Sequence, residues 1–306
     1  MSDIEGCDSG KSAHGVSAPH CRIGLVAGWG RFPVLVAQAL KAAGREVYCV
    51  ALRDHADPAL AEICDEYYPS GVARLGWHIR YFQRRGITQA TLAGKIFKHK
   101  LLFRKLGWLS LIPDLTTIRT FFPLFVTRQK NRNDDSLLSV VVEEYARSGI
   151  TLAPATDFAP ELLVKLGTLT RRQVTSAERD DIAFGWQIAK EMGRLDVGQS
   201  VVVKGRAVIA VEAVEGTDEC IRRAGELCPQ GGFTVVKVAK PQQDMRFDVP
   251  TIGVFTIQTL AAAGGKVLAI EAEKTIVVDR ADVIRLADER GLSIVALEDD
   301  AMGAEH

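Results

Sequence analysis

The sequence predicts an α/β fold made of two domains, and three observations support this prediction. Residues 22–52 follow the order strand, glycine turn, helix and strand, which is typical of a βαβ unit on a parallel sheet. Strands and helices alternate again in the second half of the chain. Between the halves, Pro160, Gly167 and mixed polar residues mark a shift in composition. We therefore expect an N-terminal domain over 22–155, a linker over 156–172 and a C-terminal domain over 173–306.

The first βαβ unit turns at Gly28-Trp29-Gly30. Glycines in this position let backbone N–H groups approach a phosphate, although a tight structural turn explains them equally well. The third glycine of a dinucleotide-binding G-x-G-x-x-G is replaced by Pro33, which fits the first turn of a helix. The second strand ends in Arg53 rather than in an acid that would bind a ribose. The pattern disfavours a nicotinamide cofactor and leaves Gly28 and Gly30 as candidates for binding a phosphate or sugar.

The other elements are predicted from hydrophobic periodicity. In the first half we expect a strand over 47–52, a strand end at 91–94 and a helix over 135–148. In the second half we expect helices over 177–192, 217–227, 256–263 and 281–290. The expected strands there are 201–203, 207–211, 233–238, 267–270 and 293–297, of which the first two form a hairpin.

Composition and charge narrow the class of protein. The chain has 306 residues, of which 47% are hydrophobic, and Lys+Arg and Asp+Glu both total 38, so no net charge favours binding to nucleic acid. Six cysteines form no C-x-x-C pair, which indicates reduced thiols in a cytoplasmic protein. Residues 1–21 are small and polar and are expected to be a disordered leader. No run approaches the about 18–20 apolar residues that a membrane-spanning helix needs.

Residues 95–130 combine basic and apolar side chains. They include eight Lys or Arg and one acid, Asp114, interleaved with Phe, Leu, Ile and Trp. Buried helices whose lysines extend to solvent explain this pattern. A basic, apolar surface that contacts an anionic membrane or accommodates acyl chains explains it equally well.

The segment VKVAKPQQDMRFDVPTIG, residues 236–253, crowds charged and amide side chains after a predicted buried strand. Carboxylates of this segment and of the segment before it could converge to hold Mg²⁺; they are Glu212, Glu215, Asp244 and Asp248. Cations of the same segment could neutralise phosphate oxygens; they are Lys237, Lys240 and Arg246. A mixture of both charges suits a pyrophosphate better than a neutral ligand. The alternative is a solvated loop with local salt bridges.

Five segments of the chain carry a specific resemblance: GLVAGWGRFP, GRLDVGQSVVV, AVEAVEGTD, KPQQDMRFDVPTIG and IVVDR. In this order, from about residue 22 to residue 299, the chain resembles the UDP-2,3-diacylglucosamine pyrophosphatases of the LpxI type. The resemblance implies a Rossmann-like N-terminal domain and a distinct α/β C-terminal catalytic domain, with substrate held between them. It also implies Mg²⁺-dependent hydrolysis of UDP-2,3-diacylglucosamine to UMP and 2,3-diacylglucosamine 1-phosphate (lipid X), a step of lipid A biosynthesis.

The residue types and the resemblance together assign roles to the candidate residues. The aspartate of the family's R-x-D-x-P-T-I-G motif is essential to catalysis, and it stands at Asp248 here. The expected catalytic residues are Asp248, Asp244, Lys240 and Arg246. The expected substrate-binding residues are Gly28, Gly30, Gln199, Thr217, Asp218, Lys237 and Gln243. The expected Mg²⁺ ligands are Asp248, Glu212 and Glu215.

The expected partners are the lipid substrate and the surface of the inner membrane, without nucleic acid and with homodimer formation left open. Two other functions stay open at this point. One is a nucleotide-sugar-binding protein without catalysis, and the other is an NAD(P)-dependent oxidoreductase, which the turn at Gly28 alone would suggest. A dimetal phosphoesterase is excluded as a homologue, because none of the six histidines lies in a D-x-H or G-N-H-D motif.

Overall fold

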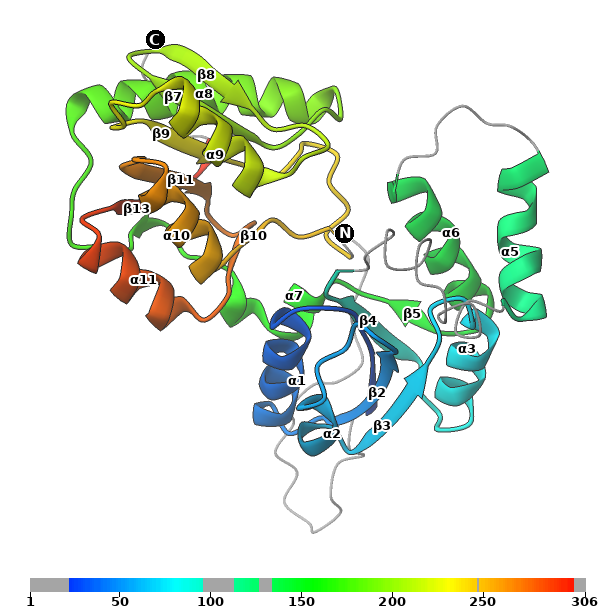
Figure 1. Ribbon diagram of the computed structural model, residues 1–306. Helices are drawn as coiled ribbons and strands as arrows, with labels where there is room; N and C mark the ends of the chain where they lie inside the picture. The colour runs from blue at the N-terminus through cyan, green and yellow to red at the C-terminus, as the bar shows by residue number, and fades with distance from the viewer. Residues whose placement is uncertain (1–21, 96–112, 127–133, 247, 300–306) are drawn as a thin grey trace. The chain divides into compact units, whose positions relative to one another are not determined.

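The computed structural model describes residues 22–95, 113–126, 134–246 and 248–299 (Figure 1). The expected leader and most of the basic, apolar segment 95–130 lie outside the described residues. The chain divides into two compact units, Met1–Ala159 and Pro160–His306, and both are α/β, which confirms the predicted fold class. Among the described residues, no helix combines the length and the apolar character that crossing a bilayer requires.

The N-terminal unit is built on a five-stranded parallel sheet in the order β3-β2-β1-β4-β5. Its strands are β1 (Arg22–Ala27), β2 (Glu46–Leu52), β3 (Glu66–Ser70), β4 (Gln89–Ala93) and β5 (Thr151–Leu152). The two central apolar strands, β1 and β2, are buried nearly throughout, as expected for a parallel sheet covered on both faces. The order reverses between β1 and β4, which is the switch point of a doubly wound sheet.

Helices cover both faces of this sheet (Figure 1). One face carries α1 (Phe32–Ala42), α2 (Leu60–Ile63) and α7 (Ala155–Phe158), and the other carries α3 (Leu75–Gln83), α5 (Leu115–Val126) and α6 (Asp134–Arg147). Pro33 stands in the first turn of α1, as its fixed φ and missing N–H predict. The expected helix over 135–148 is α6.

The C-terminal unit is built on a six-stranded mixed sheet in the order β6-β13-β11-β9-β7-β8. Its strands are β6 (Gly167–Thr168), β7 (Ser200–Lys204), β8 (Ala207–Val211), β9 (Thr234–Lys237), β11 (Val267–Glu271) and β13 (Ser293–Leu297). The three central strands, β9, β11 and β13, are parallel, and the β7–β8 hairpin continues the sheet antiparallel to β9. A separate two-stranded ladder joins β10 (Thr251–Ile252) to β12 (Ile276–Val277).

Strand alternation decides which side chains face which helices. Helix α8 (Ser176–Arg194), which begins with a capping box between Thr175 and Glu178, packs on Val236, Ala269 and their neighbours. Helices α9 (Thr217–Leu227), α10 (Val254–Ala262) and α11 (Arg280–Glu289) pack on the opposite face, over the cluster that contains Val235. Because successive residues of a strand point to opposite faces, Lys237 lies on the α9 face and Glu271 on the α8 face.

The nine elements predicted in the second half all occur, with ends within two residues of those expected. The segment expected to be a linker, 156–172, is structured: it holds the end of α7, the short 3₁₀ helix Pro160–Leu162 and strand β6. Thr168 pairs with Val295 at the edge of the second sheet, so this part of the chain belongs to the C-terminal unit.

Candidate active site

The polar side chains of the C-terminal unit gather at one edge of its sheet. Strands β9 and β11 are parallel, so their carboxyl ends meet at this edge, and Lys237 and Glu271 are their last residues. Ser200 begins the antiparallel strand β7 directly opposite Lys237. Glu212 follows strand β8 at the same edge and donates its backbone N–H to the carbonyl oxygen of Ser200. This is the edge at which open α/β sheets bind ligands.

On the α9 face, a lysine and a glutamate are buried together. Lys237 Nζ donates to Thr217 Oγ1 at 2.7 Å, and Thr217 Oγ1 donates to Glu212 Oε1 at 3.1 Å. Lys237 is 5% exposed and Glu212 is 7% exposed. Thr217 is the first residue of α9, so the amino end of that helix points into the same place. We call Lys237, Thr217 and Glu212 the Lys237 triad.

Three oxygen atoms beside the Lys237 triad are buried and have no hydrogen-bond partner among the described residues: Glu212 Oε2, Gln199 Oε1 and Asp218 Oδ1. Gly198, which precedes Gln199, lets the chain approach the backbone of Glu212 closely, because a Cβ atom at that position would lie 2.1 Å from the carbonyl oxygen of Glu212. Buried carboxylate and amide oxygens rarely lack partners in folded proteins. These acceptors therefore mark a place where a cation or a hydrogen-bond donor of a ligand would bind.

The loop that follows β9 is held by its own side chains. The backbone N–H of Lys240 donates to Gln243 Oε1 at 2.7 Å, and Gln243 Nε2 donates to Asp248 Oδ2 at 2.7 Å. The N–H of Asp248 donates to the carbonyl oxygen of Asp244 at 3.1 Å. The structure thus brings Gln243 and Asp248 together, and the amide of Gln243 is engaged within the loop.

The charged side chains of the loop form pairs. Arg246 Nε donates to both carboxylate oxygens of Asp244, at 2.9 and 3.0 Å. These hydrogen bonds hold the pKa of Asp244 below its usual value and raise the pKa of Arg246. Lys240 Nζ donates to Asp196 Oδ1 at 2.6 Å. Asp244 is therefore ionised at neutral pH and orients Arg246.

The carboxylates expected to converge on one metal ion do not converge. The carboxylate of Glu215 is engaged by other groups: it accepts hydrogen bonds from its own N–H, from Arg223 and from the N–H of Ala213, and these lower its pKa. Asp248 is held by Gln243 instead. Across the described ranges, no three His, Cys, Asp or Glu side chains are grouped as a metal site.

The glycine turn of the N-terminal unit uses its own donors. The N–H of Gly28 donates to Ala93 O at 2.8 Å, and the N–H of Trp29 donates to Lys95 O at 2.8 Å. A Cβ atom at Gly28 would lie 2.8 Å from Lys95 O. Between the two interpretations of this turn, the contacts favour the structural one for Gly28. Gly30, at φ +108°, stays a prediction.

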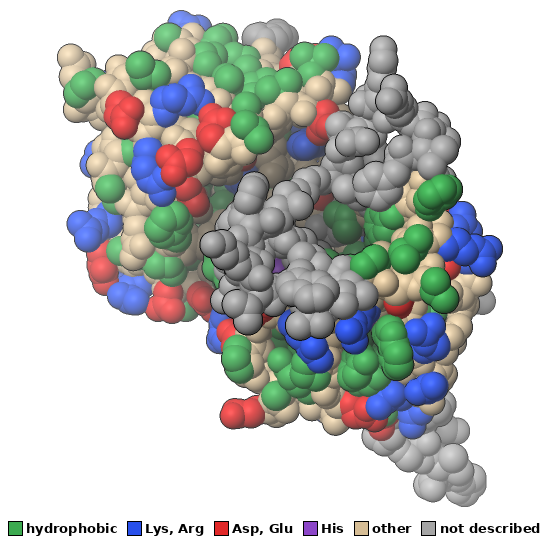
Figure 2. Space-filling model, turned by 45° about the vertical axis from the view of Figure 1, so that its right-hand side comes forward, with side chains coloured by type: hydrophobic (Ala, Val, Ile, Leu, Met, Phe, Trp, Pro, Cys, Tyr) green, Lys and Arg blue, Asp and Glu red, His purple; other side chains and the backbone are tan. Residues whose placement is uncertain are grey.

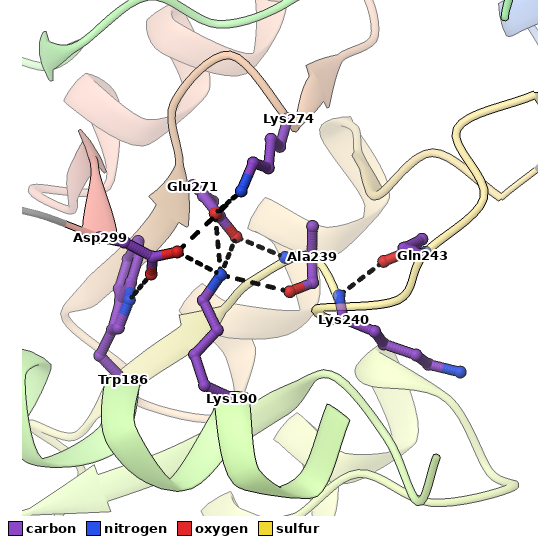
Figure 3. Close-up of polar contacts among 8 residues, drawn as sticks. All are labelled: Trp186, Lys190, Ala239, Lys240, Gln243, Glu271, Lys274 and Asp299. Atoms are coloured by element: carbon purple, nitrogen blue, oxygen red, sulfur yellow. Dashed lines mark hydrogen bonds and ion pairs between the residues drawn. The ribbon is translucent and has the colours of Figure 1, made fainter. Parts of the chain in front are cut away.

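A second polar group at the carboxyl edge was not predicted from the sequence. It lies on the α8 face and consists of Trp186, Lys190, Glu271, Lys274 and Asp299 (Figure 3). Glu271 is 2% exposed and contacts both lysines. We call these residues the Glu271 cluster. The sequence signals available were an acid at the end of an apolar strand and the i, i+4 spacing of Trp186 and Lys190 on α8.

Two family models and one curated relative match most of the chain. The family model of the LpxI N-terminal domain matches residues 22–162, and that of the LpxI C-terminal domain matches residues 165–295. The UDP-2,3-diacylglucosamine pyrophosphatase LpxI of Caulobacter vibrioides is 33% identical over 287 residues, which cover 90% of this chain and 98% of that protein.

Proposed function

Because the chain belongs to the LpxI family, we propose that it hydrolyses the pyrophosphate bond of UDP-2,3-diacylglucosamine to UMP and 2,3-diacylglucosamine 1-phosphate. The observation that carries this proposal is the Lys237 triad: a buried ammonium group next to a carboxylate that keeps one unpartnered oxygen. The anionic oxygens of a pyrophosphate would interact with the ammonium group of Lys237. A Mg²⁺ ion bound to the same pyrophosphate would interact with the carboxylate of Glu212.

Charge stabilisation is the main contribution we assign to the cations at this edge. Lys237 is buried, so its interaction with a phosphoryl oxygen would be stronger than in water. Lys240 and Arg246 lie on the adjoining loop and would stabilise charge that develops on the phosphoryl and leaving oxygens. Asp244 positions Arg246 through the paired hydrogen bonds to its Nε.

Asp248 is proposed as the group that orients the attacking water or binds the metal. Gln243 Nε2 donates to one of its carboxylate oxygens, and this contact restrains the carboxylate. Deprotonating or orienting a water needs a carboxylate that is held in place and stays ionised. A single donor on Oδ2 is consistent with either role.

Mg²⁺ is proposed as the cofactor, with Glu212 as a protein ligand. The fit rests on the buried, unpartnered Glu212 Oε2. Mg²⁺ in phosphoryl-transfer sites uses one or two carboxylates together with waters and substrate phosphates, so a third acid is not required. When bound, the ion would withdraw charge from the phosphoryl oxygens. Glu212→Gln should weaken the binding of Mn²⁺, measured by electron paramagnetic resonance, whereas Glu215→Gln should not.

The nucleoside end of the substrate is proposed to lie against Gln199 and Asp218. Each has a buried oxygen that lacks a donor among the described residues. Ribose hydroxyls and the uracil N–H are donors, and a site built from acceptors rejects analogues that lack those donors. Thr217, which precedes Asp218 in the chain, accepts a hydrogen bond from the ammonium group of Lys237, which we assign to the phosphates.

The direct test is release of UMP from UDP-2,3-diacylglucosamine with Mg²⁺ present. Asp248→Ala should keep the circular dichroism spectrum of the wild type and lower kcat by about 10²–10⁴-fold, the range for loss of a group that handles the reacting proton. A wild-type chain that binds the lipid nucleotide without releasing UMP would identify a binding protein instead. Wild-type turnover by Asp248→Ala would contradict the role given to this residue.

We also propose that α5 contacts a membrane surface. The usual pattern of burial is reversed on this helix. Thr117 and Thr120 are buried, whereas Leu115, Ile118 and Phe122 are 85%, 48% and 59% exposed. The three exposed residues follow helical spacing and form one stripe. Apolar stripes that face solvent on a helix are typical of interfacial contact.

Cations lie on α5 itself and on the neighbouring helix α3. Arg119 is exposed on α5, and the guanidinium group of Arg80 on α3 lies over the ring of the exposed Trp77, 4.9 Å from its centroid. In Figure 2, apolar and basic side chains lie side by side on this part of the surface. Basic residues next to an apolar stripe suit an anionic lipid surface, which also holds the substrate.

Vesicle sedimentation tests this contact. Ile118→Glu with Phe122→Glu should weaken binding to phosphatidylglycerol vesicles at least about tenfold, because two apolar side chains no longer insert. Val214→Glu in the C-terminal unit, where Val214 is fully exposed, is the matched control and should bind like the wild type. Equal binding of neutral and anionic vesicles would contradict the part given to the cations.

A further inference from the structure

The Glu271 cluster is a closed network of charges at the carboxyl ends of β9, β11 and β13 (Figure 3). Lys190 Nζ donates to Glu271 Oε1 at 2.8 Å and Oε2 at 2.9 Å, and it lies 3.0 Å from Asp299 Oδ2. Lys274 Nζ donates to Glu271 Oε1 at 2.8 Å, and Trp186 Nε1 donates to Asp299 Oδ1 at 2.7 Å. The two lysines balance the two acids.

These contacts also shift the pKa values of two members of the cluster. The hydrogen bond from Lys274 to Glu271 raises the pKa of Lys274. Burial raises the pKa of Asp299, but the hydrogen bonds from Trp186 and Lys190 outweigh it, so this pKa lies below the usual value. Lys274 and Asp299 are therefore both charged at neutral pH. A buried ion network is by itself weak evidence for stability. The contacts that the cluster makes with the backbone are therefore more informative about its role.

Side chains of the Glu271 cluster hydrogen-bond to the backbone just after the end of β9. The ladder between β9 and β11 ends with Lys237 opposite Ile270. Two residues later, the N–H of Ala239 donates at 2.8 Å to the side-chain Oε2 of Glu271, and Lys190 Nζ lies 3.4 Å from the carbonyl oxygen of Ala239. Both polar atoms of Ala239 are thus held by side chains of the cluster. The loop begins from a restrained peptide.

From this peptide a short chain of contacts reaches Asp248. Lys240 follows Ala239, and its N–H donates to Gln243 Oε1 at 2.7 Å. Gln243 Nε2 then donates to the carboxylate of Asp248 at 2.7 Å and also to its carbonyl oxygen. Each link after Glu271 is a hydrogen bond or a single peptide unit, so a shift of Ala239 passes to Gln243 and then to Asp248.

We propose that Glu271 and Lys190 are positioning residues that hold the Asp248 carboxylate through Ala239 and Gln243. The proposal rests on the proposed function, because it assumes that Asp248 serves the hydrolysis. Glu271 and Lys190 touch the loop backbone and not the reacting atoms. Their removal should therefore misplace a catalytic group and leave the Lys237 triad on the opposite face of the sheet intact.

Kinetics of single and double variants test the linkage. Glu271→Ala and Gln243→Ala should each lower kcat by about 10²-fold, the loss that a displacement of about 1 Å produces, with little change in KM. Because both act through one chain of contacts, the double variant should lose about as much as the worse single variant. Independent losses that multiply, or an unchanged kcat in Gln243→Ala, would overturn the proposal.

A conservative variant separates positioning from folding. Glu271→Gln keeps an oxygen that accepts from Ala239 N–H, and it should recover part of the kcat that Glu271→Ala loses. If Glu271→Ala does not fold, Glu271→Gln and Gln243→Ala still form the cycle. The control is Glu273→Gln, which removes an exposed ion pair with Lys165 in the same turn and should keep wild-type kcat. Loss of activity in Glu273→Gln as large as in Glu271→Gln would overturn the proposal.

Hydrogen exchange gives a measurement that does not depend on activity. Exchange of the Ala239 amide and of the loop that follows it should quicken in Glu271→Ala, and less in Glu271→Gln, whereas exchange in α9 should not change. Faster loop exchange together with an inactive wild type would refute the proposed function alone. Unchanged loop exchange in Glu271→Ala would refute the positioning role alone.

Discussion

The two sheets of this protein end in different ways at their carboxyl edges. In the N-terminal unit, the N–H groups of Gly28 and Trp29 donate to carbonyl oxygens at the end of β4, so the glycine turn is closed. In the C-terminal unit, buried oxygens of Glu212, Gln199 and Asp218 have no donor within the described structure. The other buried atoms without a partner among the described residues, in both units, are hydroxyl oxygens, so unpartnered carboxylate and amide oxygens distinguish the C-terminal edge.

Removing the buried ammonium group of Lys237, at the C-terminal edge, should produce the largest loss of activity in this comparison. Lys237→Met should lower kcat/KM by about 10²–10³-fold, the loss seen when one donor to a developing charge is removed. The matched control is Lys204→Met, because Lys204 lies at the opposite end of the same sheet and donates to Gly231 O. The rate of UMP release checks both variants. Equal losses in the two would place the chemistry elsewhere.

Disrupting the closed glycine turn of the N-terminal unit should lower the free energy of unfolding and leave the rate of hydrolysis unchanged. Gly94 has φ +91°, and a Cβ atom there would lie 2.8 Å from Trp29 O and 2.8 Å from Pro33 Cγ. Gly94→Ala should lower the free energy of unfolding by about 1–3 kcal/mol through strain and this clash. Chemical denaturation measures the loss.

A second glycine separates the clash from the backbone strain. Gly86 has φ +67° and open space around a Cβ atom, so Gly86→Ala carries the strain without the clash. It should lose less stability than Gly94→Ala. An equal loss in both variants would show that the contact with Trp29 contributes nothing to the turn.

A pH dependence should distinguish the N-terminal unit. Burial of His78 lowers its pKa to about 4 in the folded state, from 6.5. As the pH falls below 6.5, the unfolded chain binds a proton that the folded unit does not, so the free energy of unfolding falls until the pH nears 4. At about pH 5 the loss should be about 2 kcal/mol. Thermal unfolding at two pH values measures it, and His78→Gln should flatten the dependence.

The sequence predicted the C-terminal elements well for a physical reason. Apolar strands such as β9 and β13 are buried on both faces and are bounded by polar residues, so their limits are visible in the pattern. Strand β3 reads Glu-Tyr-Tyr-Pro-Ser and was not predicted individually, because an edge strand tolerates proline and has no strong apolar run.

The sequence was enough to predict which segments form the candidate site, but not which side chains contact one another within it. Residue types placed a site at 236–253 and at Glu212, and the structure sets both at one end of the C-terminal unit. The sequence could not show that Glu215 pairs with Arg223. Glu212 and Glu215 are close together in the chain, and the pattern alone does not say which carboxylate faces the candidate site. It could not reveal Glu271 either, since its partner Lys190 is 81 residues away in the chain.

Gly198 has a consequence for how the family's sequences should vary. A Cβ atom at this position would overlap the carbonyl oxygen of Glu212, so the constraint acts on the backbone and not on any side-chain chemistry. Selection on the acceptor oxygens beside it should then appear as retention of glycine at 198, even in relatives whose neighbouring residues differ. A mutational scan of this position should tolerate no substitution, although glycine has no side chain with which to contact a substrate.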